Sequence, residues 1–213
     1  MTIRDHWRWN ITRTLRHDPA RGDDFCGSVL QLSAHAFTHV DTPLHCNPNG
    51  PSLEKLDVYA YSGSAAIVDI SSIRANEAIT AGHFADNCSH VKTNDIVILK
   101  TLWSERCKPD SKEYWTQAPY MTDEACQLLA SLKPRVIGFD FPQDHILKTI
   151  DGSKRLTLAE STAHKHLLYN GVLFIEYLCN LGAVKQNRVN LIALPLKLEG
   201  VEGSPVRVVA IED

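Results

Sequence analysis

The 213-residue sequence contains no apolar run approaching the roughly 20 residues that a membrane-spanning helix requires. Residues 1–18 also lack the apolar core of a secretory signal peptide, so we expect a cytoplasmic protein. No two of the six cysteines form a CxxC pair or follow zinc-ribbon spacing. We therefore expect neither a disulfide framework nor a cysteine-based zinc site.

The sequence also lacks an excess of charge of either sign. Its 22 basic and 25 acidic residues give a formal net charge of -3, which excludes a strongly basic nucleic-acid-binding protein and a polybasic membrane protein. Hydrophobic residues make up 44% and charged residues 22% of the chain, as is ordinary for a globular protein. No repeat or Pro/Gly/Ser-rich linker divides it, so we expect one structural domain.

Short apolar runs alternate with helix signals along the chain. Strands are predicted over residues 65–70, 95–100, 135–139, 172–175, 191–194 and 206–211. Helices are predicted over residues 81–87, from Thr122 to a stop before Pro134, and over residues 158–170, where Gly171 ends the helix. This mixture predicts an α/β or α+β fold with a central sheet.

Histidine, by contrast, is abundant, with ten residues. Four candidate metal ligands or acid–base groups lie within eleven residues: His35, His39, Asp41 and His45. On a straight strand His35 and His39 would be about 13 Å apart, too far to share an ion. Pro43 argues against a continuous helix, so a compact turn would have to bring these side chains together.

Imidazole and carboxylate ligands suit Zn²⁺, Mn²⁺ or Fe²⁺, and three protein ligands leave a position for water or substrate. His45 could be a further ligand or the group that moves protons. The segment could instead be a histidine-rich surface loop, or its histidines could lie in the core with their hydrogen bonds satisfied by the protein.

A second group of candidates lies downstream. His164 and His166 fall near the end of the predicted helix, and Glu176 interrupts an apolar run. Burying a carboxylate costs free energy unless a metal or another cation neutralises it. Glu176 could instead point outward from an edge position or pair with an arginine.

The segment His35-Ala-Phe-Thr-His39-Val-Asp41-Thr-Pro43-Leu-His45 resembles the HxGTHxDxPxH signature of the cyclase family. The best-known activity of that family is bacterial kynurenine formamidase, a metal-dependent arylformamidase, and isatin hydrolases belong to its wider membership. Further matching segments follow in the family's order at residues 49–56, 63–69, 99–103, 136–140, 164–176, 193–196 and 203–207. We therefore expect a divergent segment over residues 1–29 and a cyclase-like metal-hydrolase domain over residues 30–213, in one structural domain overall.

The resemblance implies the family's swivelling β/β/α fold, assembled as a homodimer or homotetramer. It also implies a site for one or two divalent ions, zinc before manganese, whose ligands are His35, His39, Asp41, His164 and Glu176. Asp41 would be able to bridge two ions, and His45 takes the position of the catalytic histidine. His166 matches no motif position and is expected only to lie nearby.

The implied reaction is hydrolysis of a small amide or cyclic amide, with a metal-activated water as the nucleophile and His45 as general acid/base. The partner is then a small-molecule substrate, without nucleic acid or membrane. The alternative is a catalytically inactive metal-containing protein of the same fold that binds a small molecule. Because His45 is present together with all five implied ligands, we favour the enzyme.

Three departures from the family pattern concern the substrate pocket and the N-terminus. Phe37 replaces the usual glycine, and it would be strained if this position needs a positive φ. Phe141 opens a stretch unlike the family's small-residue segment, so we expect both phenylalanines to contact substrate. For Trp7 and Trp9, in the divergent N-terminus, we expect buried packing or an oligomer contact, with substrate contact as the alternative.

Overall fold

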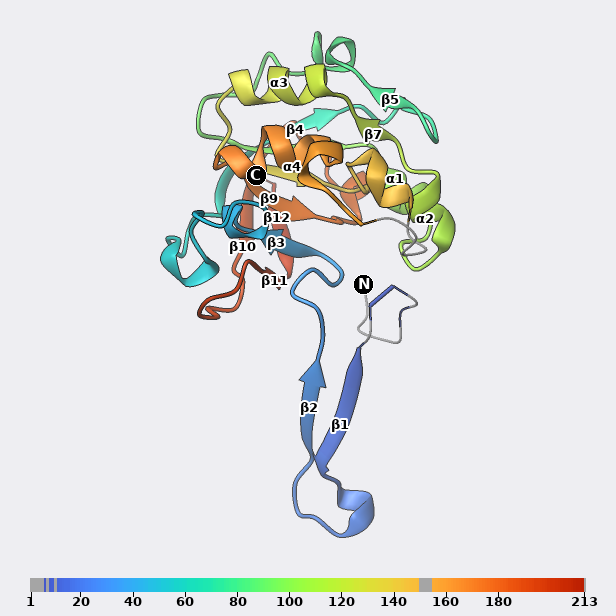
Figure 1. The fold of residues 1–213 in the computed structure, drawn as a ribbon, viewed down its shortest axis with the longest axis vertical. Helices are drawn as coiled ribbons and strands as arrows, with labels where there is room; N and C mark the ends of the chain where they lie inside the picture. Colours follow the sequence, from blue (N-terminus) through green and yellow to red (C-terminus); the bar gives the residue numbers. More distant parts are fainter. Residues whose placement is uncertain (1–5, 7, 10, 150–154, 213) are drawn as a thin grey trace.

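The computed structural model describes residues 6, 8–9, 11–149 and 155–212 (Figure 1), so Trp7 lies outside the described residues. In the described residues the strands are β1 (Thr12–His17), β2 (Gly27–Gln31), β3 (His39–Asp41), β4 (Gly63–Asp69), β5 (Ala78–Ile79), β6 (Ile96–Lys100), β7 (Tyr120–Met121), β8 (Val136–Phe139), β9 (Leu173–Glu176), β10 (Arg188–Ala193), β11 (Gly203–Pro205) and β12 (Val208–Ile211). The α-helices are α1 (Trp103–Arg106), α2 (Lys112–Thr116), α3 (Asp123–Ser131) and α4 (Thr162–His166).

The centre of the molecule is an eight-stranded mixed sheet in the order β11-β3-β9-β8-β6-β4-β10-β12. Strands β4, β6, β8 and β9 pair in parallel, whereas β11, β3, β10 and β12 pair antiparallel to their neighbours. Helices α3, α4 and α1 cover one face (Figure 1). The predicted mixed α and β fold is confirmed, and each of the six predicted strands overlaps an observed one.

The four parallel strands form because their sequences are almost uninterrupted runs of apolar residues. Such runs are typical of strands covered on both faces. One hydrophobic cluster packs between the sheet and the helices and includes Phe139, Leu129 and Leu167. A second cluster covers the other face with residues such as Ile98 and Leu191. The site described below lies where antiparallel β3 joins this buried parallel sheet.

Strands β1 and β2 form an antiparallel hairpin that projects from the body of the molecule (Figure 1). Large apolar side chains on it are exposed, including Phe25, Val29 and Leu30. The sequence patterns predicted neither strand. The expected boundary between residues 29 and 30 falls inside β2, and the division into a divergent segment and a hydrolase domain stays a prediction.

The predicted helices differ in outcome. The helix capped by Thr122 is observed as α3, but residues 81–87 form only a single 3-10 turn over Ala81–Phe84. The continuous helix predicted over residues 158–170 is wrong. It is divided into a 3-10 turn at Leu158–Glu160, α4, and a second 3-10 turn at Leu168–Asn170. The division has a local cause, because the Ser161 hydroxyl donates to the Thr157 carbonyl and competes with helical bonding.

Within the described ranges, no helix has both the length and the apolar character needed to cross a membrane.

Candidate metal centre and active site

The pairing of β3 with β9 sets the first part of the site. His39 and Asp41 are two residues apart on β3, so their side chains lie on the same face. Glu176, the last residue of β9, is directly opposite His39 in the antiparallel register. Opposed residues share a face of the sheet, so the ladder itself brings one imidazole and two carboxylates together.

These three residues, here called the inner group, are fully or almost fully buried. Nε2 of His39 lies 3.2 Å from Oδ1 of Asp41 and 3.5 Å from Oε2 of Glu176. Nδ1 of His39 donates to the Phe37 carbonyl at 2.9 Å, which leaves Nε2 with a lone pair. Neither this Nε2 nor Oδ2 of Asp41 has a hydrogen-bond partner among the described residues.

Buried polar atoms without partners are rare and costly, so a ligand is expected at such a place. One ligand atom from each member of the inner group lies within 4.8 Å of the others, close enough to surround a single ion. The donors are one imidazole and two carboxylates, which are ligand types that zinc and related divalent metals accept. The residues present therefore fit a divalent cation.

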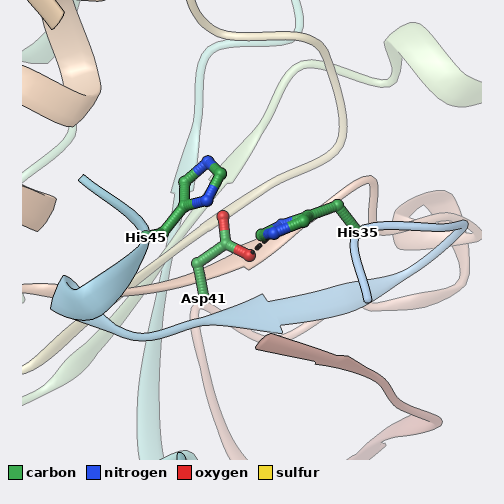
Figure 2. Close-up of side chains that lie close together, drawn as sticks. All are labelled: His35, Asp41 and His45. Atoms are coloured by element: carbon green, nitrogen blue, oxygen red, sulfur yellow. Dashed lines mark hydrogen bonds and ion pairs between the residues drawn. The ribbon is translucent and has the colours of Figure 1, made fainter. Parts of the chain in front are cut away.

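A second part of the site comes from the segments that flank β3. A turn over residues 34–38, in which Phe37 has φ 59°, reverses the chain and places His35 beside Asp41. His35 Nδ1 lies 2.8 Å from Asp41 Oδ1. His45 ends the 3-10 turn Pro43–His45, and its ring centroid is 4.1 Å from that of His35. In Figure 2 the Asp41 carboxylate lies between the side chains of these two histidines.

His35, Asp41 and His45 also have ligand atoms within 4.8 Å of one another. Asp41 therefore belongs to both sets, which is the geometry of a carboxylate shared between two cation positions. Glu202, which precedes β11, reaches the same place, with Oε1 2.9 Å from Nε2 of His35. We call His35, His45 and Glu202 the outer group, because each is partly or largely exposed.

Sequence patterns did not predict Glu202, which follows no recognisable signal. Its neighbour Gly203 allows the approach, because a Cβ there would lie 2.6 Å from the Val40 carbonyl oxygen and 3.1 Å from Oδ1 of Asp41. No real side chain could occupy that position without moving β3. Gly203 pairs with Asp41 in the β11–β3 register, so this glycine brings the Glu202 segment onto the site.

His164, on α4, extends the site on the far side of Glu176. Its Nδ1 bonds Oδ2 of Asp144 at 2.5 Å, and its Nε2 lies 3.7 Å from Oε1 of Glu176. The Gln143 side-chain amide donates to that same Oε1. Glu176 thus has one oxygen toward His39 and the other toward His164. A carboxylate behind a histidine fixes the orientation and tautomer of the ring, as is common around metals.

Gln143 and Asp144 were also missed, although they belong to the stretch after Asp140 that departs from the family pattern. His166 is near this centre in sequence, but its side chain bonds Asp123 at the start of α3. It lies outside both sets of close ligand atoms.

The charges of the carboxylates dominate the protonation of the histidines. Burial lowers the pKa of His35, but the hydrogen bond and charge of Asp41 reverse this and raise it to about 9. His164 shows the same balance, with the charge and hydrogen bond of Asp144 raising its pKa to about 9. The pKa of His39 is also raised against the effect of burial, mainly by Asp41. Without a cation, protons on His35 and His164 therefore balance part of the charge of the buried carboxylates.

The pKa values of Glu176, Asp41 and His45 shift in different directions. Burial and the nearby charge of Asp41 raise the pKa of Glu176. The pKa of Asp41 is held well below its usual range despite burial, because His39 and His35 are adjacent. Loss of hydration in the cavity, together with the charges of His35 and His164, lowers the pKa of His45 to about 4. His45 is therefore neutral near pH 7 and can accept a proton.

A cavity of about 600 Å³ opens onto this centre. Its lining includes four site residues, namely His35, His45, His164 and Glu176, together with Trp9 and Tyr177. Neither Phe37 nor Phe141 is among the described residues that line it.

Phe37 lines a different cavity, of about 420 Å³, together with residues such as Cys179 and Arg207. Phe141 is completely buried, with its ring centroid 5.8 Å from that of Phe139. Phe37 is buried against Trp9, at 5.3 Å between ring centroids, and Trp9 is itself packed on Trp115. Both side chains pack against other aromatic rings, and substrate contact by Phe37 and Phe141 stays a prediction. Trp9 combines the expected buried packing with a place on the cavity surface.

Comparisons with known proteins identify the family and the relatives of this chain. The model of the putative cyclase family matches residues 4–143. A kynurenine formamidase of Salinibacter ruber is 31% identical over 207 residues, covering 95% of this chain and 85% of that protein. The solved structure of isatin hydrolase A from Labrenzia aggregata, bound to benzyl benzoate, is 25% identical with a TM-score of 0.75, over 98% and 84% of the two chains. A potential metal-dependent hydrolase with cyclase activity is 27% identical with a TM-score of 0.69, over 94% and 85%.

Proposed function

The chain belongs to the cyclase family, and from this premise we propose that it is a metal-dependent hydrolase of a small amide or cyclic amide. The bond it breaks is a C–N bond other than a peptide bond. The observation that carries the proposal is the inner group. Its His39 Nε2 and Asp41 Oδ2 have no hydrogen-bond partner among the described residues, and its Glu176 lines a cavity large enough for a small organic molecule.

His39, Asp41 and Glu176 would hold the ion, with His164 and His35 as further ligands on either side. A divalent metal in such a site lowers the pKa of a bound water and polarises a carbonyl. The protein's own residues hold these ligands in position. The Phe37 carbonyl orients His39, and Asp144 orients His164.

His45 is the proton carrier in this proposal. It faces the cavity between His35 and His164, with ring centroids 4.1 Å and 5.3 Å away. In the protein without metal its pKa is lowered to about 4, so that the ring is neutral near pH 7 and has a nitrogen that can accept a proton. It would accept the proton of the attacking water and pass it to the nitrogen that leaves, the two halves of general acid–base catalysis.

Zinc is the proposed metal, because imidazole and carboxylate ligands occur together in catalytic zinc sites, and manganese is the second choice. The sharing of Asp41 by two sets of ligand atoms supports room for a second ion. A homodimer or homotetramer and a cytoplasmic location stay predictions, which size-exclusion chromatography and cell fractionation would test.

The test is the release of acid from a panel of formanilides and cyclic amides by protein loaded with zinc or manganese, compared with chelator-treated protein. We expect hydrolysis that chelation abolishes and added metal restores. Hydrolysis that is unaffected by chelation would contradict the metal-dependent mechanism. If metal-loaded protein is inert while a small carbonyl compound raises its melting temperature, the chain is instead a binding protein.

A further inference from the structure

Glu202 contacts the metal centre, but the proposed chemistry gives this residue no task. Its Oε1 lies 2.9 Å from Nε2 of His35, and 36% of its side-chain surface is exposed, so burial alone does not fix its position. Among the described residues, neither set of ligand atoms that could surround an ion includes Glu202, although both include Asp41. Glu202 therefore touches a candidate ligand without being placed as a ligand itself.

The fold holds the backbone of Glu202 against the centre. Its carbonyl oxygen accepts from the amide of Thr42, the residue after Asp41, at 2.8 Å. The next residue, Gly203, pairs with Asp41, where a Cβ would lie only 2.6 Å from a carbonyl oxygen of β3. Exposed ion pairs usually contribute little, because two free side chains must be ordered to form them. Here the backbone is fixed at and directly after Glu202, so its carboxylate starts from a set position beside the ring of His35.

The two ring nitrogens of His35 face two different carboxylates. Nδ1 lies 2.8 Å from Oδ1 of Asp41, and Nε2 lies 2.9 Å from Oε1 of Glu202. Turning the ring over would place carbon atoms against both carboxylates, so this pair of contacts selects one orientation of the ring. When a neutral histidine donates its Nε2–H to a carboxylate, its Nδ1 has the lone pair that a metal requires. An ion next to Asp41 would therefore meet Nδ1 of His35.

We propose that Glu202 is a positioning residue, which holds the ring of His35 so that Nδ1 is the atom that binds an ion next to Asp41. Glu202 acts on His35 as Asp144 acts on His164, but at the other nitrogen. Asp144 contacts Nδ1 of His164 and leaves its Nε2 for the metal centre, whereas Glu202 contacts Nε2 of His35 and leaves its Nδ1. This inference rests on the proposed metal-dependent function, because it concerns a ligand of the same metal centre.

The first test is a crystal structure of the zinc-loaded full chain, with data collected at the zinc absorption edge. We expect an ion about 2.0–2.1 Å from Nδ1 of His35, with the carboxylate of Glu202 within hydrogen-bond distance of Nε2. An ion on Nε2, an ion held by the Glu202 carboxylate itself, or the absence of any ion at His35 would each overturn the inference.

Substitution of Glu202 separates orientation of the ring from charge. Glu202→Ala removes the acceptor and is expected to weaken zinc binding at His35 about tenfold to a hundredfold, as for other groups behind metal-ligating histidines. Glu202→Gln keeps an acceptor oxygen of the same reach and should restore most of that affinity. Equilibrium dialysis against buffered zinc, with the metal measured by mass spectrometry, gives both affinities. Equal losses in the two variants would overturn the orienting role, because they would indicate an effect of charge alone.

Glu199→Ala is the matched control, since it removes an exposed carboxylate from the same segment of the chain. We expect this variant to bind zinc as the wild-type protein does. We also expect the ion of the inner group to remain in Glu202→Ala. A loss of affinity in Glu199→Ala as large as in Glu202→Ala, or loss of the inner ion in Glu202→Ala, would overturn the assignment, because either result indicates a general effect on charge or fold.

Neither measurement requires turnover, so the role of Glu202 and the hydrolase function can fail separately. A protein that binds zinc through Nδ1 of His35 but hydrolyses no amide would contradict the proposed function and support this inference. A protein that hydrolyses amides, and whose Glu202→Ala variant has the zinc affinity of the wild type, would contradict this inference alone.

Discussion

The inner and outer groups of the site share Asp41 as a neighbour but are built in different ways. The inner group, His39, Asp41 and Glu176, is positioned by the β3–β9 ladder and is buried, with Glu176 at the cavity. The outer group, His35, His45 and Glu202, comes from the turn before β3, the 3-10 segment after it and the segment before β11. His35 and His45 line the cavity. A ladder is rigid and loops can adjust. We infer that the sheet supplies the fixed metal position and that the loops supply proton transfer and exchange with solvent.

The largest expected effect on metal content and activity comes from substituting His39, the histidine of the inner group. His39→Ala should reduce metal content to background, and activity should fall at least about a thousandfold, because a bound metal supplies several kcal/mol of transition-state stabilisation. Inductively coupled plasma mass spectrometry measures the metal and formate release measures the activity. Full metal occupancy in His39→Ala would break the assignment of the ion to the inner group.

The outer group should respond differently. His45→Ala is expected to retain its metal but lose about a hundredfold to ten-thousandfold in kcat, the usual contribution of a general acid–base residue. The same two measurements distinguish the roles. Loss of metal in this variant would make His45 a ligand, in line with its closeness to His35 and Asp41.

Metal affinity should rise with pH. The pKa of His35 and that of His164 are raised to about 9, so both rings carry protons near neutral pH that a metal must displace. Affinity should therefore increase about tenfold per pH unit for each displaced proton as pH rises toward 9. Titration calorimetry in buffers of different ionisation enthalpy counts the released protons. Affinity that does not change between pH 6 and pH 8 would show that the rings are already neutral.

Asp144→Asn tests the support behind His164. Removing the charge that orients this ring should weaken metal binding about tenfold to a hundredfold, as for other residues behind metal-ligating histidines. Asp123→Asn is the matched control, because Asp123 pairs with Lys165 and His166 on the same helix but away from the centre. Equal effects of the two substitutions would indicate a general charge effect rather than orientation of His164.

The smallest effect concerns the turn that joins the two groups. Phe37 has φ 59°, a conformation that costs a non-glycine residue about 1 kcal/mol. Phe37→Gly should therefore be more stable than Phe37→Ala by about that amount in urea unfolding, although both lose the packing on Trp9. At Phe139, a strand position without positive φ, the order should reverse. If glycine is the more stable variant at both positions, or alanine at both, the proposed backbone strain at Phe37 is contradicted.

The inner group could be predicted in part, because two of its residues are close together in the sequence and the third is a carboxylate in an apolar run, where burial costs free energy. His39 and Asp41 share a strand face by their spacing alone, and a carboxylate inside the apolar run of β9 needed a partner. That Glu176 lies opposite His39 depends on the register between segments more than 130 residues apart, which no local pattern encodes.

Gln143, Asp144 and Glu202 were missed for the same reason. Each acts through side-chain contacts with a distant segment, and none lies in a motif of its own. The interrupted helix over residues 158–170 is the opposite case, because here a local pattern was present but the predicted element did not form. There the apolar spacing favoured a helix, but hydrogen bonds of Thr157 and Ser161 to neighbouring groups ended it.

The most direct test of the inner group as the metal position is anomalous diffraction from crystals of the zinc-loaded protein at the zinc absorption edge. We expect a peak within about 2.0–2.2 Å of His39 Nε2 and of one oxygen each from Asp41 and Glu176. A second, weaker peak between Asp41 and His35 would agree with two ions. A single peak held by His35, His45 and Glu202, with none at the inner group, would contradict the assignment.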